Sequence, residues 1–437
     1  MNALLLILGL GVCALVVITS PTEGALALLV GLLVAAVPFS LLMRRDEERT
    51  FLLRLFMSGL MLRVLIGTII FAFDLQDFFG GDALTYDFFG EAQVKAWMGD
   101  SYSRSLVSRF VGEAGGSGWG FIYLVAGVYG IVGRNILAIQ FINAVLGATT
   151  AIIVFFSAGH VFNNRRVARL AAVAVAFYPS LVLWSSQALK DGPVVFFLAM
   201  SILATLKLGE KFSVKYVLVL IVCLFAVLSF RFYVFYMITV AIAGAFIIGM
   251  QRLNASNFVR QFIILVTIGL TLTYFGIMRY ANLQFERYGS LQKIQYSRLD
   301  ASTRAQSGFL KDVDVSTTEG AFSAIPLGIL YLLFAPFPWQ IGSLRQSITL
   351  PEMIVWWASF PMLVLGLWFS IKYRLRQVSP ILIFTVMLSL VYSIFQGNVG
   401  TAYRQRAQLL VFYFIFVAVG YVLLQEKREE KRRLKLT

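Results

Sequence analysis

Acidic residues gather in the segment FGGDALTYDFFGEAQ, residues 79–93, which directly follows a long apolar run. Asp82, Asp87 and Glu91 lie within it, and Gly80 with Gly81 allows a sharp turn just before Asp82. Such carboxylates can accept a proton from a reacting hydroxyl or supply the oxygen ligands that divalent cations prefer. We therefore take Asp82 as the candidate catalytic base, and Asp82 and Asp87 as candidate ligands if a divalent cation is bound. A solvated acidic loop is the simpler alternative for any one of these residues.

The composition determines which elements must position these residues. Apolar residues make up 59% of the 437 residues and charged residues 14%, which excludes a fold around one soluble core. A membrane-spanning helix needs about 20 mostly apolar residues. We therefore expect an all-α polytopic membrane protein, with residues 1–437 forming one transmembrane domain and the apolar run 3–18 kept as the first span. Windows that qualify outright are residues 24–43, 51–73, 136–158 and 232–250.

Short segments rich in Lys and Arg recur along the chain, and such segments stay on the cytoplasmic side of a membrane. Placing all of them on one side predicts about twelve spans with both termini cytoplasmic, in a membrane that we take to be the bacterial inner membrane. The net charge of +15 then belongs mostly to the cytoplasmic face, which indicates an anionic membrane surface as the partner and no nucleic acid. The basic segments are residues 44–49, 165–169, 207–215, 252–260, 372–376 and 425–437, the last being a cytoplasmic tail.

This arrangement predicts two large outer loops, at residues 74–135 and 279–351. Two apolar stretches within them, 119–133 and 321–339, must then be re-entrant or juxtamembrane helices on the outer side, unless they span and the charge rule is broken locally. The only histidine, His160, stands beside a cytoplasmic basic segment. A reaction on the outer face would therefore depend on a carboxylate, a Tyr, a Lys or a metal.

Basic residues at the predicted outer side could bind a phosphate or pyrophosphate group, for which a guanidinium is well shaped. They stand in the turn WSSQALKDGP, in a break of the apolar stretch 216–250, after the apolar stretch 321–339, and in the loop QGNVGTAYRQR. A helix cap with an interfacial Lys, or a snorkelling Arg, is the simpler reading of the first two. The substrate-binding candidates at these places are Lys190, Asp191, Arg231, Arg345, Arg404 and Arg406.

The order of these features resembles the GT-C superfamily of polytopic glycosyltransferases, closest in style to the bacterial relatives of protein O-mannosyltransferases and aminoarabinose transferases. The motifs are G-D-x-x-x-Y at 81–86, N-N-R-R at 163–166, Y-P-S at 178–180 and W-S-S-x-x-x-K-D at 184–191. The resemblance implies a catalytic or metal-binding acid at Asp82, with Tyr86 and Asp87 beside the substrate. It also implies a donor phosphate at Arg404, supported by further basic residues. The second acid of the family's pair is Ala83 here, so a paired-carboxylate role would fall to Asp87 or to no residue.

The expected activity is a GT-C type, inverting glycosyltransferase that moves a sugar from a polyprenyl-phosphate-linked donor to a glycan or lipid acceptor on the extracytoplasmic face. Its setting would be cell-envelope or exopolysaccharide biosynthesis, with a divalent cation as the one possible cofactor. An outer-face polysaccharide polymerase or ligase using lipid-pyrophosphate-linked oligosaccharides is the first alternative. A lipid-linked glycan flippase or transporter is the second, although transporters usually carry more charge inside their spans than Arg54 and Arg63 provide.

Overall fold

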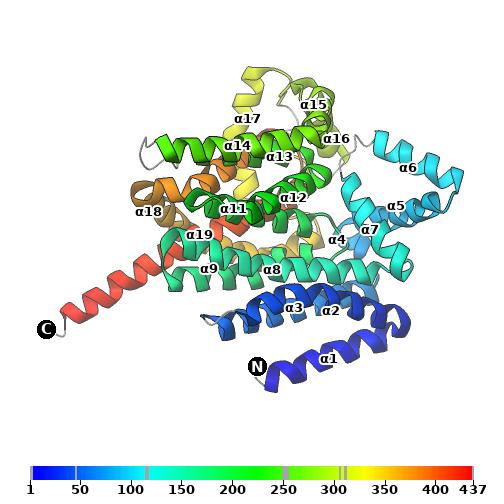
Figure 1. Cartoon of the computed structure of the whole chain (residues 1–437), viewed down its shortest axis with the longest axis horizontal. Helices are drawn as coiled ribbons and strands as arrows, with labels where there is room; N and C mark the ends of the chain where they lie inside the picture. The colour runs from blue at the N-terminus through cyan, green and yellow to red at the C-terminus, as the bar shows by residue number, and fades with distance from the viewer. Residues whose placement is uncertain are drawn as a thin grey trace. The chain divides into compact units, whose positions relative to one another are not determined.

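The computed structural model describes residues 3–44, 47–113, 118–248, 255–304, 307–309 and 313–435. Within these ranges every regular element is a helix (Figure 1), which confirms the all-α prediction. The basic residues Arg45 and Arg252 and parts of both predicted outer loops lie outside the described residues. The chain divides into two compact units, and four of the described helices contribute residues to both: α8 (Ile136–Phe162), α9 (Arg165–Phe177), α11 (Asp191–Glu210) and α12 (Val214–Phe230).

Unit 1 comprises residues 1–153, 172–197 and 229–231. Its first three helices pack against one another, with Val16, Ala27, Val64 and Phe141 in a shared apolar core. The predicted outer loop 74–135 folds into four helices, of which the second packs against the third and the fourth. In chain order the described helices that contribute to unit 1 are α1 (Ala3–Thr19), α2 (Pro21–Met43), α3 (Arg49–Ala72), α4 (Gln76–Gly80), α5 (Asp82–Trp97), α6 (Ser101–Glu113), α7 (Trp119–Val132), α8 (Ile136–Phe162), α9 (Arg165–Phe177), α10 (Pro179–Ser185), α11 (Asp191–Glu210) and the end of α12 (Val214–Phe230).

Unit 2 comprises residues 154–171, 198–228 and 232–437, and its last two helices form its central pair. Glycines let these two helices approach closely, because a Cβ on Gly366 would lie 1.8 Å from the Phe416 carbonyl oxygen. Non-helical dihedral angles at Arg374 divide the longer helix into two segments. The elements are α12 (Val214–Phe230), α13 (Phe232–Ile248), α14 (Ala255–Tyr274), α15 (Ile277–Tyr288), α16 (Leu291–Arg304), α17 (Thr318–Phe334), the 3₁₀ helix η1 (Pro338–Gln340), α18 (Leu344–Phe395) and α19 (Val399–Leu434).

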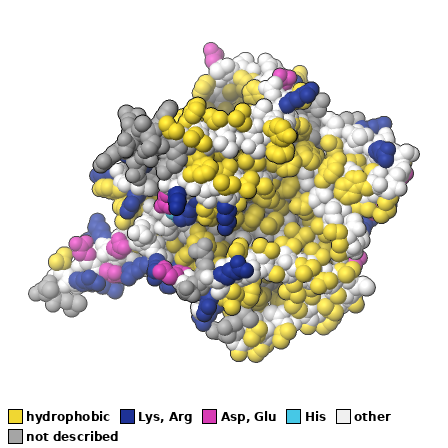
Figure 2. Space-filling view, in the orientation of Figure 1, with side chains coloured by type: hydrophobic (Ala, Val, Ile, Leu, Met, Phe, Trp, Pro, Cys, Tyr) yellow, Lys and Arg dark blue, Asp and Glu magenta, His cyan; other side chains and the backbone are white. Residues whose placement is uncertain are grey.

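Among the described residues, six helices are long and apolar enough to cross a membrane: α2, α3, α8, α11, α18 and α19. The number rises to eight if the bent pairs α9 with α10 and α14 with α15 each form one span. α7 and α17, predicted to stay on the outer side, are shorter apolar helices, but so are α1, α12 and α13, which we predicted to span. The count of about twelve spans therefore stays a prediction. Hydrophobic side chains cover much of the face in Figure 2, while charged side chains gather along the C-terminal part of α19.

Candidate active site

Asp82 begins α5 immediately after the turn at Gly80 and Gly81, as the paired glycines predict. Gly80 has φ 148°, a left-handed value that favours glycine. The Asp82 side chain is exposed, whereas Asp87 on the same helix is buried. Five residues along an α-helix correspond to a rotation of about 140°, so the two carboxylates point in different directions. This geometry does not favour a cation shared between them.

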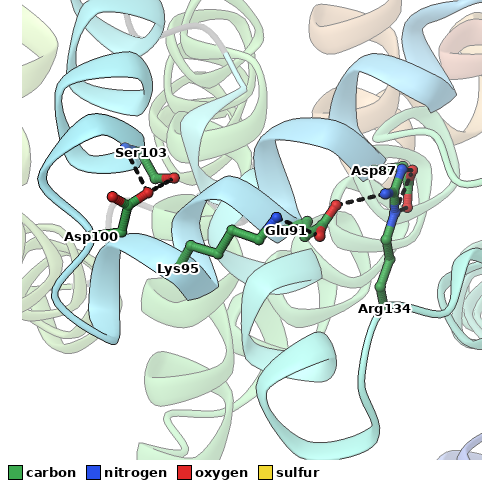
Figure 3. A network of polar contacts seen from close by, with 6 residues as sticks. All are labelled: Asp87, Glu91, Lys95, Asp100, Ser103 and Arg134. Carbon is green, nitrogen blue, oxygen red and sulfur yellow. Dashed lines mark hydrogen bonds and ion pairs between the residues drawn. The ribbon is translucent and has the colours of Figure 1, made fainter.

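The Asp87 carboxylate is instead held inside unit 1 by two partners that the sequence analysis missed, Tyr129 and Arg134 (Figure 3 shows the arginine). The Tyr129 hydroxyl donates to Oδ1 at 2.6 Å, and Arg134 donates Nη2 to Oδ2 at 2.5 Å and Nε to Oδ2 at 3.1 Å. Arg134 also donates Nη1 to Glu91 at 2.6 Å, and Lys95 binds the other oxygen of Glu91 at 2.8 Å. Asp87 and Glu91 thus share a helix face, as their spacing predicts.

The electrostatics of this network follow from its geometry. The hydrogen bonds to Asp87 raise the pKa of Arg134, and burial raises the pKa of the Tyr129 hydroxyl. A guanidinium in direct contact with Asp87 supplies the positive charge that a divalent cation would otherwise bring, so this carboxylate does not fit a cation site. Within the described ranges, no three His, Cys, Asp or Glu side chains are grouped so that they could hold a metal ion.

Two predicted motifs meet in unit 1, although about 100 residues separate them in the sequence. Tyr86 of the G-D-x-x-x-Y segment is buried, and the Lys190 ammonium lies 5.8 Å from the centroid of its ring. Gly118 lies against both of these side chains. It has φ 87°, and a Cβ there would lie 2.8 Å from Lys190 Nζ and 3.4 Å from the Tyr86 hydroxyl. Three separate segments therefore bring a cation, a phenol and a bare backbone position together.

Asp191 and Arg231 form an ion pair that is almost fully buried in unit 1. Asp191 is the first residue of α11, and Arg231 lies in the predicted break between α12 and α13. Arg231 does not snorkel toward solvent, because its side chain is only 5% exposed. Its charge is balanced by Asp191, so the direct phosphate contact suggested for Arg231 is not favoured.

The turn that carries Lys190 is held by polar side chains from two long helices, and the sequence analysis assigned neither of them to this role. Asn143 of α8 donates Nδ2 to the Gln187 and Leu189 carbonyl oxygens at 2.7 and 2.8 Å. Arg63 of α3 donates Nε to Ser185 Oγ at 2.8 Å and Nη1 to the Ala176 carbonyl oxygen at 2.8 Å. Arg63 thereby donates hydrogen bonds to carbonyl oxygens in the last turn of α9, which have no partner within the helix. These contacts fix the position of the turn relative to α3 and α8.

In unit 2, the predicted loop 396–406 is shorter than expected. Asn398 ends it by accepting a hydrogen bond from Gly400 N at 2.8 Å, which caps α19, so Arg404 and Arg406 stand on a helix. The Arg406 side chain is buried and donates Nε to the Leu332 carbonyl oxygen at 2.5 Å and Nη2 to that of Ala335. The guanidinium is thus engaged by backbone carbonyls, so the donor-phosphate contact predicted for Arg406 is not favoured. Arg404 is half-buried.

The loop before α19 is supported by the predicted outer region 279–351. Buried Arg298 donates Nε to the Gln396 carbonyl oxygen at 3.4 Å, and Phe309 N donates to the Gly397 carbonyl oxygen at 2.9 Å. Ser307 Oγ donates to Asn398 Oδ1 at 2.8 Å. Arg345, the remaining candidate, is exposed in the first turn of α18. Region 279–351 therefore fixes the start of the helix that carries Arg404.

Comparison with known proteins points to the same superfamily. Residues 118–276 match the model of the dolichyl-phosphate-mannose-protein mannosyltransferase family, a stretch that includes α7, the Lys190 turn and Arg231. No curated protein matches the chain. The family match supports a glycosyltransferase of the GT-C type and confirms the resemblance for this part of the chain.

Two solved structures are also similar, both of the oligosaccharyltransferase from Archaeoglobus fulgidus. One is the apo form, with 12% identity, a TM-score of 0.43, and coverage of 73% of this chain and 44% of the other. The second is tethered through a disulfide bond to an acceptor peptide containing the NVT sequon, with 13% identity, a TM-score of 0.43, and coverage of 73% and 42%. The chain thus spans less than half the length of these enzymes.

Proposed function

We propose that this chain transfers a sugar from a polyprenyl-phosphate-linked donor to a hydroxyl of a glycan or lipid acceptor, on the extracytoplasmic side of a bacterial inner membrane. The product would serve cell-envelope or exopolysaccharide biosynthesis. The observation that carries the proposal is the meeting of Tyr86 and Lys190 beside Gly118 in unit 1. Tyr86 and Lys190 belong to two of the four motifs on which the glycosyltransferase resemblance depends, and the family match includes Gly118 and Lys190.

Asp82 is the proposed base. It is exposed and stands four residues before Tyr86, so both side chains leave α5 on the same face. In the proposed reaction the acceptor oxygen forms a bond to the anomeric carbon, and the bond from that carbon to the donor phosphate oxygen breaks. The acceptor proton passes to Asp82, and the electron pair of the broken bond stays on the polyprenyl phosphate.

The leaving phosphate needs positive charge at the moment its own charge develops. Lys190 supplies it in unit 1, because its ammonium is fixed beside Tyr86 and the backbone approaches closely at Gly118. For Arg404 of unit 2 we propose, independently of Lys190, a contact with the donor phosphate, since Arg404 is half-buried near the capped start of α19. Asp191 follows Lys190 directly, and its buried ion pair with Arg231 holds this end of the turn in place.

The test is sugar transfer by the purified full chain in detergent, with a polyprenyl-monophosphate-linked sugar as donor. Asp82→Asn should lower kcat about 10²- to 10⁴-fold, because general-base catalysis contributes this much. The matched control is Asp77→Asn, which changes an exposed carboxylate in the same outer segment and should leave kcat unchanged. Activity of Asp82→Asn near wild type would refute the assignment of the base.

The same assay separates the competing functions. A polymerase or ligase would transfer from an oligosaccharide linked through a pyrophosphate and leave the monophosphate donor unused. A flippase or transporter would transfer no sugar in detergent, where no membrane gradient exists. Turnover of the monophosphate donor alone is the result we expect.

A further inference from the structure

Unit 2 contains a cavity of about 240 Å³ that the proposed reaction does not use. It lies among the C-terminal ends of α8, α11 and α13, one face of α14, and the break in α18. The basic segments 165–169, 207–215 and 372–376, all predicted to be cytoplasmic, adjoin these helix ends. Arg376 at the cavity and Gln396 before α19 are separated by 20 residues of α18. A helix of that length spans about 30 Å, so the cavity lies far from Arg404 within unit 2.

Two arginines line the cavity where α18 changes direction. Arg374 has φ −134° and ψ 18°, outside the helical region, and this break brings both Arg374 and Arg376 to the cavity wall. The guanidinium group presents a planar fork of N–H donors that matches the oxygens of a phosphate. Two guanidinium groups on one wall therefore favour a phosphate group as ligand.

His160 also lines the cavity, and its ring lies between a cation and an anion. Lys207 Nζ lies 3.0 Å from His160 Nδ1, and Glu210 Oε1 lies 3.4 Å from His160 Nε2. An ammonium group only donates hydrogen bonds, so Nδ1 accepts and the proton of the neutral ring is on Nε2, toward Glu210. Among the lining side chains, Arg374, Arg376 and Glu210 leave one more positive than negative charge, and Lys207 adds a further positive charge next to His160.

Gln261 adds an uncharged polar group to the wall. Its side chain is only 5% exposed, and its Oε1 has no hydrogen-bond partner among the described residues. A buried polar atom without a partner is costly and uncommon in folded proteins. A ligand that carries hydroxyl groups next to its phosphate would provide a donor for such an oxygen.

We propose that this cavity binds a phosphate group, distinct from the donor phosphate of the transfer reaction. The volume lies below the range of roughly 300–1,000 Å³ typical of pockets for drug-sized ligands, so it fits a headgroup or a small phosphate ester better than a whole nucleotide. Two sources supply this chemistry: the headgroup of an anionic phospholipid in the adjacent leaflet, or a soluble phosphate. The bound group would connect the break in α18 with the ends of α8, α11 and α13 and with α14.

The test measures thermal unfolding of the full chain at constant ionic strength, with two probes. Inorganic phosphate is added in detergent with chloride as control, and nanodiscs of phosphatidylglycerol are compared with nanodiscs of phosphatidylcholine. We expect at least one probe to raise the Tm, and the Arg374→Gln/Arg376→Gln double variant to bind it at least about tenfold more weakly, since hydrogen bonds to charged groups contribute this much. Stabilisation by phosphatidylglycerol alone identifies the lipid as the source, and stabilisation by inorganic phosphate identifies the soluble one.

Two further variants keep the proposal falsifiable if the double variant does not fold. Lys372→Gln removes one charge from the same segment without touching the cavity, because Lys372 contacts the rings of Trp368 and Tyr373 instead. It should bind the probe like wild type. Glu210→Gln removes the negative charge of the wall and should tighten binding up to about fivefold. No response to either probe, an equal response in the double variant, or unchanged binding in Glu210→Gln would overturn the proposal.

Discussion

Tyr129 donates its phenolic proton to Oδ1 of Asp87 across 2.6 Å, joining α7 to α5. Arg134, two residues after α7 ends, binds the same carboxylate from another side. Since α5 also carries Asp82 and Tyr86, these bonds fix the orientation of the proposed base and of the ring beside Lys190. We infer that Asp87 is a positioning residue and that its contribution to activity is transmitted through α5.

Replacing Asp87 should lower the free energy of unfolding, because Tyr129 and Arg134 lose their shared acceptor. Asp87→Asn should reduce the free energy of unfolding by about 1–3 kcal/mol, because it weakens a buried hydrogen bond to a charged acceptor. In a double-mutant cycle with Arg134→Gln, the coupling energy should be only about 1 kcal/mol, since half of the Arg134 side chain is exposed and water screens the pair. Lys95→Gln, which breaks an exposed pair with Glu91, is the control and should cost a few tenths of a kcal/mol. A divalent cation that stabilises wild type and not Asp87→Asn would contradict this role.

The Tyr129 hydroxyl should make stability sensitive to high pH. Burial raises its pKa above the ordinary tyrosine value near 10, and the hydrogen bond to Asp87 raises it further. Above about pH 10 the unfolded chain releases a proton that the folded chain keeps, so the free energy of unfolding falls as the pH rises. Below that pH this group contributes no pH dependence. We expect the Tm to fall more steeply between about pH 9.5 and 11 in wild type than in Tyr129→Phe. Equal slopes would show that Tyr129 does not titrate this way.

The interruptions of the helices could be predicted from the sequence, because each has a local chemical cause. Paired glycines precede Asp82, a polar turn precedes Pro193, and Arg231 interrupts an apolar run. A helix begins or ends at each of these three places. The end of the 396–406 loop was missed because its glycines suggested irregular backbone throughout. Asn398 was the available signal for the start of this helix, because Asn is a favoured N-cap residue and its side chain accepts a hydrogen bond from Gly400 N.

The polar contacts that support the candidate site could not be predicted in the same way. Arg63 binds Ser185 across 122 residues, and Arg134 binds Asp87 across 47. A single sequence shows that Arg63 interrupts an apolar helix, which indicates an important polar partner. It does not show which of many carbonyl and hydroxyl oxygens that partner is, because this depends on the packing of helices far apart in the chain.

Arg63 should be needed to hold the turn that carries Lys190. Arg63→Gln should lower the free energy of unfolding by at least about 2 kcal/mol, because buried oxygens of Ala176 and Ser185 lose their donor. The rate of sugar transfer should fall as well, because the Lys190 turn moves. Arg63→Lys should restore only part of the stability and of the rate, since an ammonium lacks the planar fork of a guanidinium. Arg54→Gln, at an exposed position of the same helix, is the control and should stay within about 0.5 kcal/mol of wild type. Full transfer activity in Arg63→Gln would contradict the positioning role.

Gly118 should not tolerate a side chain. Gly118→Ala introduces a Cβ 2.8 Å from Lys190 Nζ and keeps a left-handed backbone that costs an L-residue about 1–2 kcal/mol. We expect a lower Tm and a higher KM for the donor, because the ammonium must move. Gly127→Ala is the control, since nothing lies within 4 Å of its Cβ inside α7, and it should be neutral or stabilising by up to about 1 kcal/mol. Donor KM values that agree between the two variants would exclude Lys190 from donor binding.

Arg404 and Arg406 stand two residues apart on α19, but substitution of Arg406 should affect stability and substitution of Arg404 should affect donor binding. Arg406→Gln should lower the free energy of unfolding by about 2 kcal/mol or more, because the buried carbonyl oxygens of Leu332 and Ala335 lose their donor. Arg404→Gln should leave the Tm within about 1 °C and raise the KM for the donor about tenfold or more, since a charge-assisted bond to phosphate is lost. Arg404→Lys should recover part of that affinity. Thermal unfolding and steady-state kinetics of both variants, measured on the same preparations, check the assignment. A donor KM at the wild-type value in Arg404→Gln would remove this residue from the proposed phosphate site, whatever happens to Arg406.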